Sequence, residues 1–488
     1  MWFLGLGHLS ALDLASDGKQ SRRMTATNLL GVVNPAAFLA AGKWDRPGLV
    51  AVLNAAAVAY HAEKTARLRI AKLTQTDSFV VVTGQQPAVG GGPLYSLVKT
   101  AHAIAAARIM GEQAVPLFWC ASEDHDVGEA SHADIVLRDG SIRRFTGDLG
   151  DGRMSLRFRS AHRWWDAWWA HCQEYLGDGI GSAWLTQQQP VDHESMGTWT
   201  CRLMTALFAG HGLVCVEGHY LRPLWSATMQ RALTTWPTAN LMLLRQRLLA
   251  EGHQDAFGLL DQPPVFSDRV DGRTAVTIAE AQALLITDPT VLSPGAALRP
   301  ILQQAALPAL AYVGGPGELA YHQFIMPLYA ALGVEAPRLV PRCSLTLVPS
   351  WVERGAERWQ VTVEALNGQS PSDSSTSAAV LSELDAALFA LAERPAAMPE
   401  QRRINAGLIR LKRERNRLAA SLERAHRQQR ERPAWGALQG WLWPRGERQE
   451  RTLSLFQALW QFGPGISDRL VEAAAVSEPG AHRFVSLK

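Results

Sequence analysis

The sequence of 488 residues contains few cysteines, and their arrangement excludes a disulfide framework and a zinc-finger-type site. There are five, an odd number, and no two of them form a CxxC pair. Disulfide-rich secreted domains and structural zinc sites both need cysteines paired at short spacing. Four of the five lie in apolar or aromatic stretches, so we expect buried, reduced thiols. The five are Cys120, Cys172, Cys201, Cys215 and Cys343.

Long hydrophobic runs are also missing. No apolar stretch approaches the roughly 20 residues that a membrane-spanning helix needs. The amino terminus begins with a short apolar stretch, but no basic region precedes it, and His8 and Asp13 interrupt it. A secretory signal peptide is therefore not expected. We predict a cytoplasmic protein with no membrane partner.

Neither sign of charge dominates. Lysine plus arginine number 48 and aspartate plus glutamate 45, which gives a net charge of +3. A protein built to neutralise nucleic-acid phosphates would show a larger positive excess. Ten arginines do gather between residues 402 and 432, but no aromatic residues alternate with them, which is typical of a solvated helix surface. We expect no nucleic-acid partner.

Short apolar runs alternate with helical segments along the first 340 residues. Several runs are followed by a glycine-rich or acidic loop, and then by a helix. Strand, loop, helix and strand in this order indicate βαβ units and a buried parallel sheet. The sequence therefore predicts an α/β fold with a Rossmann-like parallel-sheet core. The runs are 79–82, 115–120, 213–216 and 309–313, and the main helices between them are 94–110 and 318–332.

The carboxyl-terminal third has a different pattern. Apolar residues alternate by three and four from Leu381 to Leu391 and from Ile404 to Ala425, with Arg415 at one of these positions. This spacing predicts an α-helical coiled coil that forms a homodimer. We divide the chain into core segments 1–138, 211–236 and 291–366, insertions 139–210 and 237–290, a polar linker 367–379, the coiled coil 380–432 and a segment 433–488 that returns to the core.

Two glycine-rich loops follow predicted strands. In open α/β sheets, ligands bind at the carboxyl ends of the strands, where glycine N–H groups and helix N-termini favour anions. The loops match neither GxGxxG nor GxxxxGK[ST]. A turn requirement for the glycines, a surface position for Lys99 and structural ion pairs for the two arginines explain the pattern equally well. The candidate binding residues are Gly84, Gln85, Gln86, Gly91, Gly92, Tyr95 and Lys99 in the first region, and Arg299, Tyr312, Gly314, Gly315, Gly317, Glu318 and Arg342 around the second.

An acidic segment, Ser122 to Asp126, follows the strand that ends at Cys120. It supports three interpretations. A carboxylate can orient His125 so that it deprotonates an amine nucleophile. The carboxylates and histidines up to His132 can bind a divalent metal, or they can cap the next helix. We assign Glu123, Asp124, His125 and Asp126 as catalytic, Ser122 as substrate-binding, and no metal.

Taken together, the loops, the acidic segment and the sequence around them resemble the family of bacillithiol biosynthesis cysteine-adding enzymes. The combination of TGQQ, SEDHD and GGPGE is specific, and the similarity runs from about residue 80 to residue 470. Ala88, Cys120 and Val127 depart from the usual family residues, but none of them removes a polar group. The matching strings are VVTGQQPAVGGGPLYSLVKTAHAI, VPLFWCASEDHDVGEASH, LSPGAALRPILQQAALPALAYVGGPGELAYH, PRCSLTLV, WPRGERQER and FGPGISDRL.

The resemblance implies two connecting-peptide insertions, a coiled coil that pairs two subunits, and a ligase that joins cysteine to glucosaminyl-malate. Because a free carboxylate does not condense with an amine in water, we expect a nucleotide, ATP or another, to activate the cysteine carboxyl. Lys99 and an arginine suit the malate carboxylates. Two alternatives remain: a metal-dependent hydrolase that uses the SEDHD cluster, and a non-catalytic coiled-coil binding protein.

Overall fold

The computed structural model describes residues 34–235, 250, 264–366, 375–393, 398–430 and 433–487. Its contacts divide the chain into two units. Unit 1 comprises Met1–Ile135, Arg144–Thr346 and Glu450–Val485, and unit 2 comprises Val136–Arg143, Leu347–Gln449 and Ser486–Lys488. The chain passes between them within β3 (His132–Val136), β4 (Ile142–Thr146), β11 (Ser344–Val348), α19 (Gln449–Thr452) and β12 (His482–Ser486).

Unit 1 contains a five-stranded parallel sheet in the order β10-β9-β1-β2-β5. Strands β2 and β5 follow β1 on one side, and the later strands β9 and β10 lie on its other side. The direction in which strands are added therefore reverses between β1 and β9. The carboxyl ends at such a switch point flank the crevice where doubly wound sheets bind ligands. The predicted Rossmann-like sheet is confirmed. Its strands are β1 (Phe79–Gln85), β2 (Ala114–Cys120), β5 (Val214–Glu217), β9 (Ala309–Gly314) and β10 (Arg338–Pro341).

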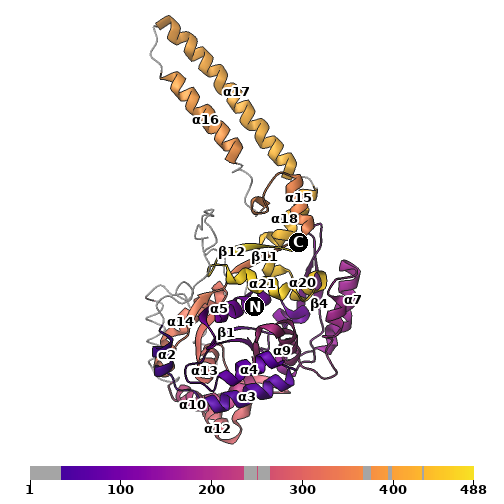
Figure 1. The fold of residues 1–488 in the computed structure, drawn as a ribbon, viewed down its shortest axis with the longest axis vertical. Helices are drawn as coiled ribbons and strands as arrows, with labels where there is room; N and C mark the ends of the chain where they lie inside the picture. Colours follow the sequence, from indigo (N-terminus) through magenta and orange to yellow (C-terminus); the bar gives the residue numbers. More distant parts are fainter. Residues whose placement is uncertain are drawn as a thin grey trace. The chain divides into compact units, whose positions relative to one another are not determined.

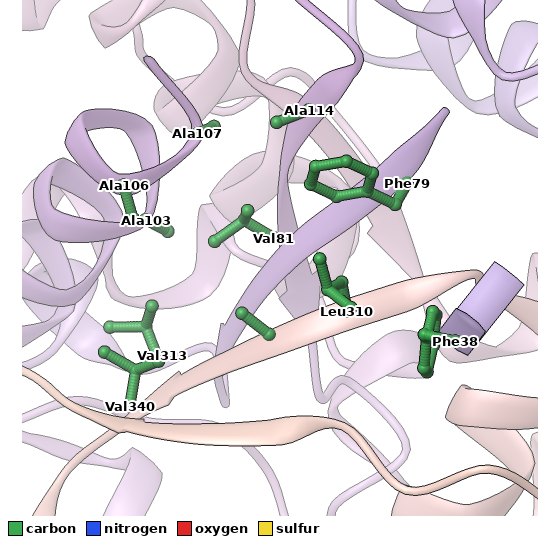
Figure 2. Packing of buried hydrophobic residues seen from close by; sticks show 11 residues of the cluster. Phe38, Phe79, Val81, Ala103, Ala106, Ala107, Ala114, Leu310, Val313 and Val340 are labelled. Carbon is green, nitrogen blue, oxygen red and sulfur yellow. The ribbon is translucent and has the colours of Figure 1, made fainter. Parts of the chain in front are cut away.

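Helix α5 (Tyr95–Met110) packs on the sheet with small side chains. Its alanines allow a close approach to β1, and Figure 2 shows Ala103 and Ala106 facing Val81. Helix α21 (Ile466–Ala475) packs against α5 as well. Because α5 has neighbours on both sides, every residue from Ser96 to Ala107 is buried, including the ionisable ones.

Further helices and two small sheets complete unit 1. The small sheets are β3-β4 and β7-β6-β8, with β6 (Val265–Arg269), β7 (Gly272–Ala275) and β8 (Leu292–Pro294). The helices are α2 (Pro35–Ala41), α3 (Arg46–Ala59), α4 (Lys64–Lys72), α6 (Val127–Ala130), α7 (His162–Leu176), α8 (Ser182–Thr186), α9 (Met196–Leu207), α10 (Ser226–Thr235), α12 (Ile278–Thr287), α13 (Arg299–Ala306), α14 (Pro316–Ala331) and α20 (Leu455–Phe462). Short 3-10 turns include η1 (Val89–Gly91), η2 (Leu156–Phe158) and η4 (Gly218–Trp225).

Unit 2 is helical, with α15 (Ser350–Arg358), α16 (Ser375–Ala392), α17 (Met398–Arg430) and α18 (Pro433–Leu442). Helices α16 and α17 lie side by side and antiparallel (Figure 1). Arg415 forms an ion pair with Asp385 of α16, at 2.6 Å between Nη2 and Oδ2. The residue in the predicted seam therefore has a partner within the same chain.

The expected helices of this region are confirmed, whereas a coiled coil between subunits stays a prediction. Of the predicted linker, residues 367–374 lie outside the described part, and α16 begins at Ser375. The boundaries of the two predicted insertions also stay predictions. None of the described helices is long and apolar enough to cross a bilayer.

Candidate functional site

Lys99 joins the two predicted loops. Its side chain, on α5, is only 1% exposed, and its ammonium donates to the carbonyl of Gly84 and to Gln85 Oε1 at 2.8 Å. It also contacts both carboxylate oxygens of Glu318 at 3.0 Å. Gly84 and Gln85 end β1, while Glu318 lies in the first turn of α14 after β9. The structure thus brings both loops together at the switch point, and Lys99 is a buried residue.

Glu318 is held in its ionised form. It accepts hydrogen bonds from the Tyr312 hydroxyl at 3.1 Å and from the backbone N–H of Gly315 at 2.8 Å. Burial alone would raise the pKa of Glu318, but Lys99 and these hydrogen bonds lower it overall. Gly314 has a packing role, because a Cβ there would lie 2.8 Å from the Tyr312 ring. Gly317 is half-buried in the same turn of α14.

Two arginines near Lys99 differ in how their donors are used. Arg342 forms a close ion pair with Glu450 and donates to the carbonyl of Cys343 at 3.0 Å. Arg299, the first residue of α13, is half-buried, and none of the described residues accepts a hydrogen bond from its guanidinium. Its charge nevertheless lowers the pKa of Lys99, after burial and Arg342. Arg299 is therefore a cation near Lys99 whose guanidinium donors have no acceptor among the described residues.

Tyr95 lies between these cations. Its hydroxyl accepts a hydrogen bond from Gln85 Nε2 at 3.2 Å. Its ring centroid is 5.5 Å from Lys99 Nζ and 5.6 Å from the guanidinium carbon of Arg342. Aromatic faces attract cations at such distances. The ring therefore helps to keep both positive side chains beside the crevice.

The glycines of the first loop serve the turn. Gly91 and Gly92 have φ of 73° and 76°, in the left-handed region that favours glycine. Their N–H groups donate to the carbonyls of Ala88 and Val89, at 3.0 and 3.2 Å. A Cβ on Gly91 would lie 2.9 Å from Leu455. The geometry favours the turn requirement over direct anion binding, and a Val at Gly91 would disturb the packing against Leu455. Gln86 forms a side-chain hydrogen bond with Glu129. Burial raises the pKa of Glu129, and this hydrogen bond partly opposes that rise.

The carboxylates around His125 cap backbone groups. Asp124 Oδ1 accepts from the N–H groups of His125 and Asp126 at 2.7 and 3.0 Å, and Asp126 caps α6 by accepting from Glu129 N–H at 3.1 Å. Within the described part of the chain, no group of three His, Cys, Asp or Glu side chains is arranged to hold a metal ion. The capping interpretation therefore accounts for both aspartates.

The imidazole of His125 faces an arginine instead of the expected carboxylate. Its Nδ1 lies 3.1 Å from Arg273 Nη1. Because a guanidinium only donates hydrogen bonds, Nδ1 accepts, and the neutral ring carries its proton on Nε2. Burial, and then Arg273, lower the pKa of His125. Arg273 thus takes the place of the expected carboxylate partner, and the neutral ring presents an N–H donor; the assignment of His125 as a catalytic base stays a prediction.

Glu123 belongs to a buried ion network, which we define as Glu123, Arg157, Arg222 and Asp268. Arg222 Nε donates to Glu123 at 2.8 Å, and its Nη2 donates to Asp268 at 2.8 Å. Arg157 Nε lies 2.9 Å from the same Asp268 oxygen. The four residues come from four different segments, and two positive charges balance two negative ones. Glu123 therefore has a partner within the chain, and through Arg222 the network links the end of β2 to β6; a catalytic role for Glu123 stays a prediction.

Ser122 leads to a carboxylate that the sequence analysis did not select. Its hydroxyl donates to Glu217 Oε2 at 2.6 Å, at the end of β5. Glu217 is 1% exposed, and burial raises its pKa. Glu217 is the last residue of β5, and Glu123 comes shortly after β2, so the search for carboxylates at strand ends that selected Glu123 also applies to Glu217. The arginines at positions 157, 222 and 273 lie in segments with no motif, and no sequence signal marks them.

The comparisons with known proteins match most of this chain to one family. A family profile described as "Bacillithiol biosynthesis BshC, N-terminal Rossmann-like domain" matches residues 34–254 and 265–343. A protein of Koribacter versatilis named "Putative cysteine ligase BshC" is 29% identical over 444 residues, which cover 81% of this chain and 82% of that protein. Proteins with the same name from Desulforamulus reducens and Symbiobacterium thermophilum are 26% and 25% identical. They cover 85% and 93% of this chain, and 85% and 92% of their own length.

Proposed function

The chain belongs to the bacillithiol biosynthesis BshC family, and from this premise we propose that it joins cysteine to glucosaminyl-malate with a nucleotide activating the cysteine carboxyl. The relatives' name supports a ligase that uses cysteine. The amino-sugar substrate, the nucleotide and the residue roles below are the finer parts of the proposal.

The observation that carries the proposal is the group of cations at the switch point. Lys99 is fixed by three partners, and the guanidinium of Arg299 near it has no acceptor in the part of the chain that the structure describes. A half-buried guanidinium with free donors suits a phosphate or carboxylate, which it binds with two parallel hydrogen bonds. Both the malate part of the acceptor and the phosphates of a nucleotide carry such groups. A bound nucleotide supplies the group that converts the cysteine carboxylate into an acyl donor.

The protein's own side chains then have defined tasks. Arg299 binds and orients the anionic group, while Gln85 and Tyr95 fix the wall of the crevice beside it. His125 presents its Nε2–H to the oxygen that becomes negative when the amine attacks. Preorganised donors of this kind stabilise the developing charge more than the ground state. Arg273 positions His125 by fixing its tautomer.

The proposal extends to subunit assembly. Leu391, Leu411 and Leu418 of α16 and α17 are 40%, 47% and 39% exposed, whereas Leu388 and Leu408 are buried. The pairing of the two helices thus leaves part of the leucine pattern uncovered. A second subunit that packs on these leucines would bury it, which supports a homodimer.

The proposed activity is tested with purified protein, cysteine, glucosaminyl-malate and a panel of nucleoside triphosphates. We expect a thiol product whose mass equals the two substrates minus water, formed together with nucleotide cleavage. The matched control is Arg299→Ala, which removes the free guanidinium. In a deletion strain, mass spectrometry of small thiols is expected to show accumulated glucosaminyl-malate. No product with any nucleotide, and no accumulation, would contradict the proposal.

A further inference from the structure

A cavity of about 660 Å³ opens in unit 1 at the carboxyl end of β5. Glu217 and Arg157 line it, together with Thr198 from the first turn of α9. None of the residues in contact with Lys99 belongs to its wall. At its exposed rim, His61 and His193 hold left-handed backbone, with φ of 54° and 63°. Residues other than glycine rarely adopt this conformation, and such strain concentrates at functional sites.

The carboxyl group of Glu217 forms no ion pair with a lysine or arginine of the described residues, although the charge of Arg157 is near enough to oppose the burial that raises the pKa of Glu217. The nearest nitrogen of an ionisable side chain is His219 Nδ1 at 3.9 Å. That ring is neutral, because burial and Arg157 lower the pKa of His219 to about 3. A buried carboxyl group without a counter-charge is costly, and an ammonium group would relieve that cost. The groups that do hydrogen-bond Glu217 are the hydroxyls of Ser122, Tyr60 and Thr198.

Arg157 brings unused donors to the same cavity. Its Nε faces Asp268, and its guanidinium carbon lies 4.2 Å from the ring centroid of Phe158, so its orientation is fixed. None of the described residues accepts a hydrogen bond from its two terminal nitrogens. Arg202, which also lines the cavity, differs: its donors go to Glu194 at 2.8 and 2.9 Å. Arg157 is therefore the guanidinium in this wall that is prepared for a ligand.

We propose that this cavity binds a ligand that carries both a carboxylate and an amine, with the carboxylate on Arg157 and the ammonium on Glu217. The inference rests on the proposed function, because both proposed substrates, free cysteine and glucosaminyl-malate, have these two groups. The carboxylate of the ligand meets the two terminal nitrogens of Arg157 that have no acceptor among the described residues, and its ammonium meets Glu217, which forms no ion pair with a lysine or arginine of these residues. The hydroxyls around Glu217 keep the carboxylate oxygens in place between ligands.

Calorimetry on the full-length protein tests the pairing group by group. Arg157→Met removes the guanidinium, and Glu217→Gln removes the negative charge while preserving shape. Each is expected to weaken the binding of the ligand about tenfold or more, because hydrogen bonds to charged groups are among the stronger ones. Asp192→Asn, an exposed carboxylate at the rim, is the matched control and is expected to change affinity less than about twofold.

Truncated ligands make the test specific. Cysteamine lacks the carboxylate of cysteine, and 3-mercaptopropionate lacks its amine. For the sugar, glucosamine lacks the malate, and N-acetylglucosaminyl-malate lacks the free amine. Arg157→Met should leave the affinity for the ligand without the carboxylate, cysteamine or glucosamine, unchanged. Glu217→Gln should leave the affinity for the ligand without the free amine, 3-mercaptopropionate or N-acetylglucosaminyl-malate, unchanged. If the cysteine-related ligands show this pattern, the occupant of the cavity is cysteine; if the sugar-related ligands show it, the occupant is glucosaminyl-malate.

Folded variants that bind both complete ligands with unchanged affinity would overturn the inference. If a variant fails to fold, crystals of the unmodified protein soaked with each ligand decide: a ligand that contacts both Arg157 and Glu217 supports it, and one bound elsewhere overturns it. If the unmodified protein binds the ligand in this cavity but makes no product, the proposed function fails and the inference stands. If the variants turn over both substrates with unchanged KM, the inference fails and the proposed function stands.

Discussion

Replacing Lys99 by Met tests whether the contacts between the two loops stabilise unit 1. Met has a similar length but no charge, so the change leaves the Gly84 carbonyl and Gln85 Oε1 without their donor and Glu318 without its cation. Removing one partner of a buried ion pair typically costs about 3–5 kcal/mol. Glu318 is 28% exposed and keeps Tyr312 and Gly315 as donors, which places the expected loss near about 3 kcal/mol.

The assay is calorimetric unfolding of the full chain. At about 2 °C per kcal/mol for a domain of this size, Lys99→Met should lower Tm by about 6 °C. The double variant Lys99→Met with Glu318→Gln removes both charges and should lose less than the sum of the two single changes. A fall in Tm of less than about 2 °C for Lys99→Met, or strictly additive changes, would refute the reasoning.

The same pair gives a pH dependence with a definite sign. The pKa of Glu318 lies below its ordinary value of 4.5 in the folded protein. A depressed folded pKa means that the unfolded chain binds more protons in this range, so stability rises with pH there. Its contribution is present above about pH 4.5 and is lost as the pH falls through the folded pKa. Glu318→Gln should therefore flatten the acid limb of the Tm profile.

Three further predictions concern function and assembly. Arg299→Ala should raise KM for an anionic substrate or nucleotide about tenfold or more with Tm unchanged, and steady-state kinetics with unaltered KM would contradict this. His125→Ala should lower kcat about 100-fold or more, while His125→Gln, which keeps a donor near Nε2, should retain more; recovery of the Ala variant at higher pH would indicate a base instead. Leu411→Asp with Leu418→Asp should convert the proposed homodimer into monomers in light scattering. A monomeric unmodified protein would show that α16 and α17 pack only on each other within one chain.

The sheet could largely be predicted from the sequence, because its strands are buried on both faces and appear as continuous apolar runs. Strand β10 was missed, since only four residues, Arg338–Pro341, form it and charge and proline occupy its ends. The helices before β1 also contain a break, because α3 ends at Ala59 and α4 begins at Lys64, with His61 in left-handed backbone between them. Periodicity alone does not register such a turn.

The candidate site was predictable only in part, for a physical reason. Carboxyl ends of neighbouring parallel strands meet at one edge, so the meeting of the loops around Lys99 and Glu318 follows from strand order. Ion-pair partners depend on side-chain reach between distant segments. His125 and Arg273 are 148 positions apart, and Arg342 and Glu450 are 108 apart. No local pattern encodes either contact, so the partner of His125 was expected to be a neighbouring carboxylate.

The strand order also explains how one edge of the sheet can serve a reaction of two substrates. The cations of the switch point lie at the ends of β1 and β9, and the cavity with Glu217 lies at the end of β5. In the order β9-β1-β2-β5, these ends are separated by at most three strand spacings, about 15 Å. Ser122, which follows the strand between β1 and β5, hydrogen-bonds Glu217 directly. If glucosaminyl-malate is the ligand at Glu217, we propose that an acyl donor bound at Arg299 meets it over the end of β2, where His125 presents its N–H group.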